Sequence, residues 1–126
     1  MSIVRVIIRK DGPPASVEMI CGHNQPGAYV LREWNKELSA KLFEEFGDFR
    51  VVHDDRYPLM LPLELNDECL LQSITRVGIV PPEKKYYVGM IIRQGEKVLE
   101  NGKIEEEGES TNTTVRVHLR AFLEVV

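Results

Sequence analysis

The segment Cys21-Gly22-His23 places a thiol and an imidazole two residues apart at the end of a predicted strand. A nucleophilic cysteine needs a nearby base that takes its proton, so this pair could support covalent chemistry. However, Cys21 has the same parity as Val17 and Met19, which predicts that it faces the core as a small apolar side chain. The residues alone leave both interpretations open.

A second group of reactive side chains occupies the turn His53-Asp54-Asp55-Arg56-Tyr57. In an enzyme, His53 or His23 would act as general base. Asp54 or Asp55 would share this role, and Arg56 would hold the carboxylate of a small organic acid. The alternative is that the two aspartates only accept hydrogen bonds from backbone N–H groups of the turn. The spacing predicts no metal site and no cofactor, although His23 and His53 could share a metal if the fold brought them together.

Residues 113–126 are predicted to form a long strand with strictly alternating side chains. One face is wholly apolar, and the other carries Arg116, His118 and Arg120 in a row. Protonation of His118 is expected to be disfavoured by the two neighbouring cations. The second face of this strand is therefore a candidate binding surface.

The N-terminal strand, Ile3 to Arg9, would add Arg5 and Arg9 to this basic surface if both strands belong to one sheet. Three interpretations remain open. The arginines could pair with glutamates of neighbouring strands on a solvated face. They could form the contact of a homo-oligomer, because the acidic hairpin from Glu96 to Glu109 offers the opposite charge. They could also bind an anionic ligand through their guanidinium groups.

The segment from Tyr29 to Phe46 is predicted to form one long amphipathic helix. Its apolar residues recur at steps of three and four, at Val30, Leu31, Trp34, Leu38, Leu42 and Phe46. Charged residues fill the positions between them, and Gly47 would end the helix because glycine readily adopts a positive φ. This helix is expected to pack on a sheet.

Strands are predicted on both sides of the helix. Ile3–Arg9 and Ala15–Cys21 are expected to form a hairpin around the glycine and prolines of residues 11–14. Asn101-Gly102 is the strongest hairpin signal in the chain and would pair Lys97–Glu100 with Lys103–Glu106. Further strands are predicted at residues 49–53, 59–65, 68–80 and 86–93.

These elements predict a single α+β domain over residues 1–126, with one helix across a mostly antiparallel, curved sheet. The alternative is a partly open β-barrel or a β-sandwich with one helix. A pocket between helix and sheet would suit a small anionic or apolar ligand. The predicted ligand-binding residues are Arg116, His118, Arg120, Arg56, Tyr57 and Trp34.

Composition limits the function classes. The 126 residues carry a net charge of -4 and a pI of about 5.4, which argues against binding to nucleic acid or to a membrane surface. Two distant cysteines and the lack of a secretory leader favour the cytoplasm. No P-loop, dinucleotide, serine-hydrolase or zincin motif occurs. We therefore expect a non-enzymatic binding or assembly domain that acts as a homodimer or through a pocket. The alternative is the small hydrolase or isomerase described above.

Overall fold

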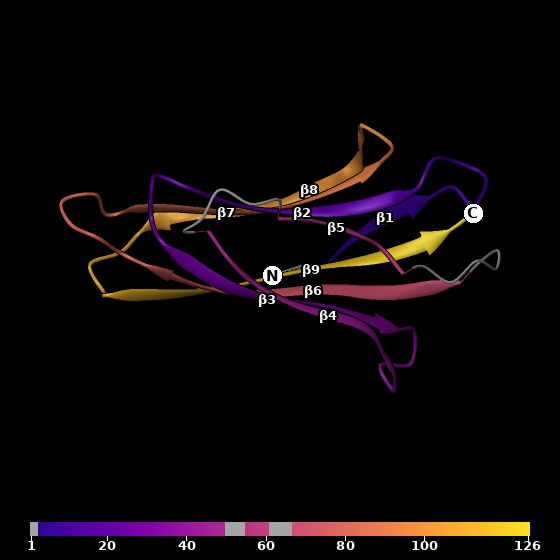
Figure 1. Ribbon diagram of the computed structural model, residues 1–126, viewed down its shortest axis with the longest axis horizontal. Helices are drawn as coiled ribbons and strands as arrows, with labels where there is room; N and C mark the ends of the chain where they lie inside the picture. Colours follow the sequence, from indigo (N-terminus) through magenta and orange to yellow (C-terminus); the bar gives the residue numbers. More distant parts are fainter. Residues whose placement is uncertain (1–2, 50–54, 61–66) are drawn as a thin grey trace.

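Two β-sheets stacked face to face make up the structure, a computed structural model that describes residues 3–49, 55–60 and 67–126 (Figure 1). The five-stranded sheet has the order β1-β9-β6-β3-β4, and the four-stranded sheet has the order β5-β2-β7-β8. The strands of the described residues are β1 Val4–Ile8, β2 Ala15–Gly22, β3 Gly27–Asn35, β4 Lys41–Asp48, β5 Arg56–Pro58, β6 Glu68–Gly78, β7 Lys85–Gln94, β8 Lys97–Glu109 and β9 Thr114–Val125. Paired strands are antiparallel except β1 and β9, which are parallel.

The core lies between the two sheets, where alternate side chains of both sheets meet. In β9, Val117, Leu119, Ala121 and Leu123 are fully buried, as the alternation of this strand predicts. Their counterparts in the other sheet are Val17, Met19, Val88, Met90 and Ile92. In Figure 1, β2, β7 and β8 form the upper layer, while β3, β4 and β6 form the lower one. Each sheet therefore turns one face to the core and one face to solvent.

The helix predicted from Tyr29 to Phe46 is wrong, because this segment forms the antiparallel strands β3 and β4. None of the residues that the structure describes is helical, so neither the α+β class nor the barrel or sandwich with one helix is correct. The error has a physical cause in β3. Val30 and Trp34 lie on its outer face, Leu31 and the charged Glu33 point inward, and apolar residues on both faces hide the period of two.

The first two predicted strands exist as β1 and β2, but they do not form a hairpin. β1 pairs with β9, whereas β2 pairs with β5 and β7 of the other sheet. Residues 11–14 therefore carry the chain from one sheet to the other. Two consecutive prolines with fixed φ and no N–H donors suit such a crossing better than a tight turn.

Asn101-Gly102 is also not a hairpin turn, since β8 runs through it from Lys97 to Glu109. The turn between β7 and β8 is Gly95-Glu96, where Gly95 has a φ of 62° and Gln94 pairs with Lys97. Asn101 has a φ of 61° within an irregularity of the β7–β8 ladder. The positive φ that the sequence predicts is thus present, but it forms a bulge.

The predictions for residues 68–80 and 86–93 are confirmed as β6 and β7. Those for residues 49–53 and 59–65 fall largely outside the described residues, and so do His53 and Asp54. The described part of the chain contains no helix that could cross a membrane.

Candidate binding surface

The hydrogen bond that the structure gives Cys21 goes to Gln25 and not to His23. The Cys21 Sγ–H donates to the backbone oxygen of Gln25 at 3.3 Å, and burial raises the pKa of the thiol to about 11. Cys21 is therefore a neutral thiol at physiological pH. His23 lies in a turn with a φ of 60° and lines a surface hollow beside Tyr86 and Glu107.

Asp55 and Tyr57 belong to a hydrogen-bond cluster at the edge of the core. The hydroxyl of Tyr29 donates to Asp55 Oδ1 at 2.7 Å, and the hydroxyl of Tyr57 lies 2.5 Å from that of Tyr29. The backbone oxygen of Asp55 accepts a hydrogen bond from the N–H of Met19. Burial raises the pKa of Tyr29, and its bonds to Tyr57 and Asp55 add to this effect. The cluster links β5 of the four-stranded sheet to β3 of the five-stranded sheet.

Arg56 fixes the turn between β7 and β8 on the outer side of the four-stranded sheet. Its Nε donates to Ser16 Oγ at 3.0 Å, and its Nη2 donates to the backbone oxygen of Gly95 at 2.9 Å. Its Nη1 lies 3.5 Å from a carboxylate oxygen of Glu96. Within the described ranges, no group of three or more His, Cys, Asp or Glu side chains could hold a metal ion.

The other four predicted ligand-binding residues share one surface, the outer face of the five-stranded sheet. Arg116, His118 and Arg120 lie on β9, and Trp34 lies on β3, with β6 between these strands. We call this surface the arginine face and define it by Trp34, Phe46, Gln72, Ile74, Arg76, Arg116, His118 and Arg120.

A chain of hydrogen bonds crosses the arginine face from β3 to β9. The indole N–H of Trp34 donates to Gln72 Oε1 at 3.2 Å, which turns the amide nitrogen of Gln72 toward β9. This nitrogen lies 2.9 Å from His118 Nε2. Because the amide nitrogen can only donate, His118 Nε2 accepts, and its ring proton is on Nδ1.

The charge state of His118 agrees with this arrangement. Partial burial and the charges of Arg120 and Arg116 lower its pKa. A neutral imidazole provides the acceptor that Gln72 needs, whereas a protonated ring would turn a second donor toward the amide. The three-residue chain therefore fixes the Trp34 indole and the His118 ring in place at neutral pH.

Arg76 and Arg116 lie directly opposite one another on β6 and β9. The Cβ atoms of directly opposed residues are about 5 Å apart, so the two exposed guanidinium groups repel one another. Beside them is a shallow hollow of about 490 Å³, lined in part by Val30, Ile74 and Phe46. Phe46 is 71% exposed. The hollow thus combines two cations with an apolar floor.

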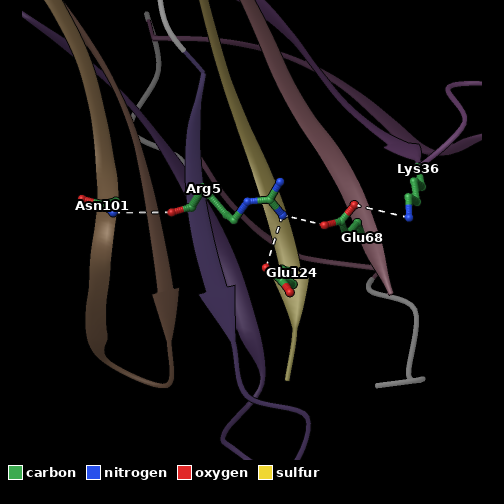
Figure 2. Close-up of polar contacts among 5 residues, drawn as sticks. All are labelled: Arg5, Lys36, Glu68, Asn101 and Glu124. Carbon is green, nitrogen blue, oxygen red and sulfur yellow. Dashed lines mark hydrogen bonds and ion pairs between the residues drawn. The ribbon is translucent and has the colours of Figure 1, made fainter. Parts of the chain in front are cut away.

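Arg5 lies on the same sheet face, but carboxylates compensate its charge (Figure 2). Its Nη1 lies 2.5 Å from Glu68 Oε1 and 3.2 Å from Glu124 Oε2, and Lys36 also approaches Glu68. The hydrogen bond from Arg5 lowers the pKa of Glu68. The surface predicted to combine Arg5 with Arg116 and Arg120 is therefore divided into a compensated and an uncompensated part.

The other arginines of this sheet show the same division. Arg32 pairs with Glu44 at 2.5 Å. Within the described ranges, Arg76, Arg116 and Arg120 have no carboxylate within ion-pair distance. Arg9 follows β1 as an exposed residue, and its backbone is held by the side chain of Gln94.

Glu33 has a position that the sequence did not predict. It was expected on the polar face of a helix, yet it is fully buried, and its carboxyl oxygens have no hydrogen-bond partner. Burial raises the pKa of Glu33 to about 7; the backbone of Met60 and the thiol of Cys69 oppose this shift without forming well-aligned bonds.

The sequence also did not single out Arg76, Gln72 and Phe46. Alternation along the predicted strand at residues 68–80 places Gln72, Ile74 and Arg76 on one face. Arg76 and Gln72 could therefore have been found from the sequence. Phe46 could not, because the predicted helix places it on the side that faces the core.

Comparisons of the chain with protein families, characterised proteins and solved structures gave no match.

Proposed function

We propose that this protein is a non-enzymatic binding domain and that the arginine face holds an anionic partner. The observation that carries the proposal is the pair Arg76 and Arg116, which oppose one another without a carboxylate between them. Like charges directly opposed in a sheet destabilise it, and a bound anion would remove this repulsion. Guanidinium groups also offer several parallel N–H donors to a carboxylate or phosphate.

The apolar part of the surface supports a partner larger than a simple ion. Phe46, Ile74 and Val30 border the arginines, and Trp34 is held in a fixed orientation by Gln72. Tryptophan, tyrosine and arginine are enriched among the residues that contribute most of the binding energy of protein interfaces. A macromolecular segment that carries acidic side chains fits this combination.

The enzyme alternative has less support. Asp55 is bonded to Tyr29, Cys21 has a raised pKa, and Arg56 is bound to the β7–β8 turn. Cys21 and Cys69 are both free thiols, as is usual for proteins of the reducing cytoplasm. We therefore keep a cytoplasmic location as part of the proposal.

Thermal unfolding in the presence of tripolyphosphate tests the arginine face with a compact polyanion. The ligand should raise the melting temperature of the wild type at low salt, because it binds the folded state only. The variant Arg76→Gln/Arg116→Gln should lose this increase.

Arg5→Gln is the matched control, since Arg5 lies on the same sheet face but is already paired with Glu68 and Glu124. It should keep the response to tripolyphosphate. An equal loss in this control and in the double variant would mean that the probe senses only net charge, and would contradict the proposal.

A further inference from the structure

The outer side of β8 carries a row of acidic residues, and the outer side of β9 carries Arg116, the neutral His118 and Arg120 at the same spacing. Glu105, Glu107 and Glu109 are exposed, while the residues between them are half-buried. Glu105 is partly compensated, because it accepts a hydrogen bond from the Tyr87 hydroxyl at 2.5 Å and lies 3.8 Å from Lys103. Glu107 and Glu109 have no cation within ion-pair distance in the part of the chain that is described.

The acidic row and the arginine face match in length. Same-side residues of a strand are about 6.8 Å apart, so Glu105 to Glu109 spans about 14 Å, as does Arg116 to Arg120. Each row also borders apolar side chains: Tyr87 lies opposite Glu107 in β7, and Ile74 lies opposite His118 in β6. Opposite charges next to apolar groups are the composition of a specific contact.

The two rows cannot meet within one molecule. The acidic row is on the outer face of the four-stranded sheet, and the arginine face is on the outer face of the five-stranded sheet. Because the two sheets pack through their inner faces, these outer faces point in opposite directions (Figure 1). Any contact between them joins two copies of the chain.

We propose that the acidic row of β8 in one copy docks on the arginine face of a second copy, so that the protein assembles head to tail. This inference rests on the proposed function, because it identifies the anionic partner as the chain itself. A head-to-tail contact uses two different patches and leaves one of each free, so assembly continues until a ring closes or a linear chain forms.

Sedimentation of the full chain at rising concentration tests this assembly. At low salt the average mass should rise above the 14.4 kDa of one chain. Added salt should reverse the increase, because it screens exposed charges. Glu107→Lys should weaken association by about tenfold or more, since it places like charges together. Glu37→Lys, the same change in an exposed loop residue, should leave association unchanged.

A charge swap gives the decisive result. The face variant Arg116→Glu/Arg120→Glu and the strand variant Glu107→Arg/Glu109→Arg should each remain monomeric alone. Their mixture should associate in two ways: the acidic face of the first variant meets the basic strand of the second, and the unchanged acidic row of the first meets the unchanged arginine face of the second. Glu107, Glu109 and Arg116 are exposed, and Arg120 is half-buried on the outer face. Far-ultraviolet circular dichroism with thermal unfolding checks that both variants fold.

Failure of the assembly and failure of the proposed function give different results. If the wild type stays monomeric at every concentration, or the mixed variants do not associate, self-assembly is overturned. If tripolyphosphate still stabilises the wild type but not Arg76→Gln/Arg116→Gln, the arginine face binds an anionic partner other than this chain. If that stabilisation is also absent, both proposals are wrong.

Discussion

Replacement of Glu33 by glutamine should make the protein markedly more stable above neutral pH. Glu33 is fully buried without a hydrogen-bond partner, and burial raises its pKa from 4.5 to about 7. A raised carboxyl pKa means that the folded chain prefers the neutral acid. The charged form, which dominates at higher pH, is therefore the unfavourable one.

The sign and size of the effect follow from the two pKa values. Below pH 4.5, Glu33 is neutral in the folded and in the unfolded chain. Between pH 4.5 and about 7 only the folded chain keeps the proton, so the free energy of unfolding falls as the pH rises. The total loss is about 3 kcal/mol, at about 1.4 kcal/mol for each pH unit. Above this range the loss is complete and stays constant.

Urea unfolding of the wild type and of Glu33→Gln, compared at each pH between about 4 and about 8.5, measures the loss of unfolding free energy that Glu33 causes. The other titrating groups are common to both proteins and cancel in the difference. The stability of the variant relative to the wild type should rise across the range by up to about 3 kcal/mol.

Glu45→Gln is the control, because Glu45 is an exposed carboxyl on the neighbouring strand β4. It should keep the pH dependence of the wild type. If the difference between Glu33→Gln and the wild type did not change with pH, the reasoning about the buried carboxyl would be refuted.

Three further predictions concern the same sheet. Gly47→Ala should cost about 1–3 kcal/mol in urea unfolding, because its new Cβ would overlap the ring of Tyr29; unchanged stability would mean that the ring can move. Tyr29→Phe should cost about 1–2 kcal/mol, since it leaves Asp55 without the hydroxyl donor; a variant as stable as the wild type would contradict a structural role for this bond. Titration of His118 by nuclear magnetic resonance should give a pKa below 6.5, and Arg116→Gln should raise it. Because that pKa is lowered in the folded state, acidification through it should destabilise the fold, and a pKa at or above 6.5 would count against the neutral ring.

The sequence predicted the strands whose two faces differ in polarity. The sequence predicts β9 with its buried and exposed faces correct, because every inward residue is apolar and the outer face is polar from Thr114 to Arg120. β3 was missed because Val30 and Trp34 lie on its outer face while Glu33 is buried. Periodicity records hydrophobic character, and it fails where a strand carries apolar residues on its outer face and a charged residue on its inner face.

The candidate surface was predicted only in part for a related reason. Arg116, His118 and Arg120 follow one another on one strand, so alternation reveals them. Arg76 and Trp34 join them only through the strand order β9-β6-β3, which depends on pairings between distant parts of the chain. Arg56 and Tyr57 were included for their chemistry, and tertiary contacts with Gly95 and Tyr29 occupy them instead.

The parallel pairing of β1 with β9 has a consequence for how the chain folds. Val4 lies beside Ala121, so β1 pairs with β9, the strand furthest from it in sequence among the described residues. The loop closed by this contact spans nearly the whole chain, and contacts of such sequence separation slow folding because their entropic cost must be met early. During synthesis, β1 therefore stays without its pairing partner until β9 has been translated. The positive charges of Arg5 and Arg9 would help to keep the unpaired β1 segment from aggregating.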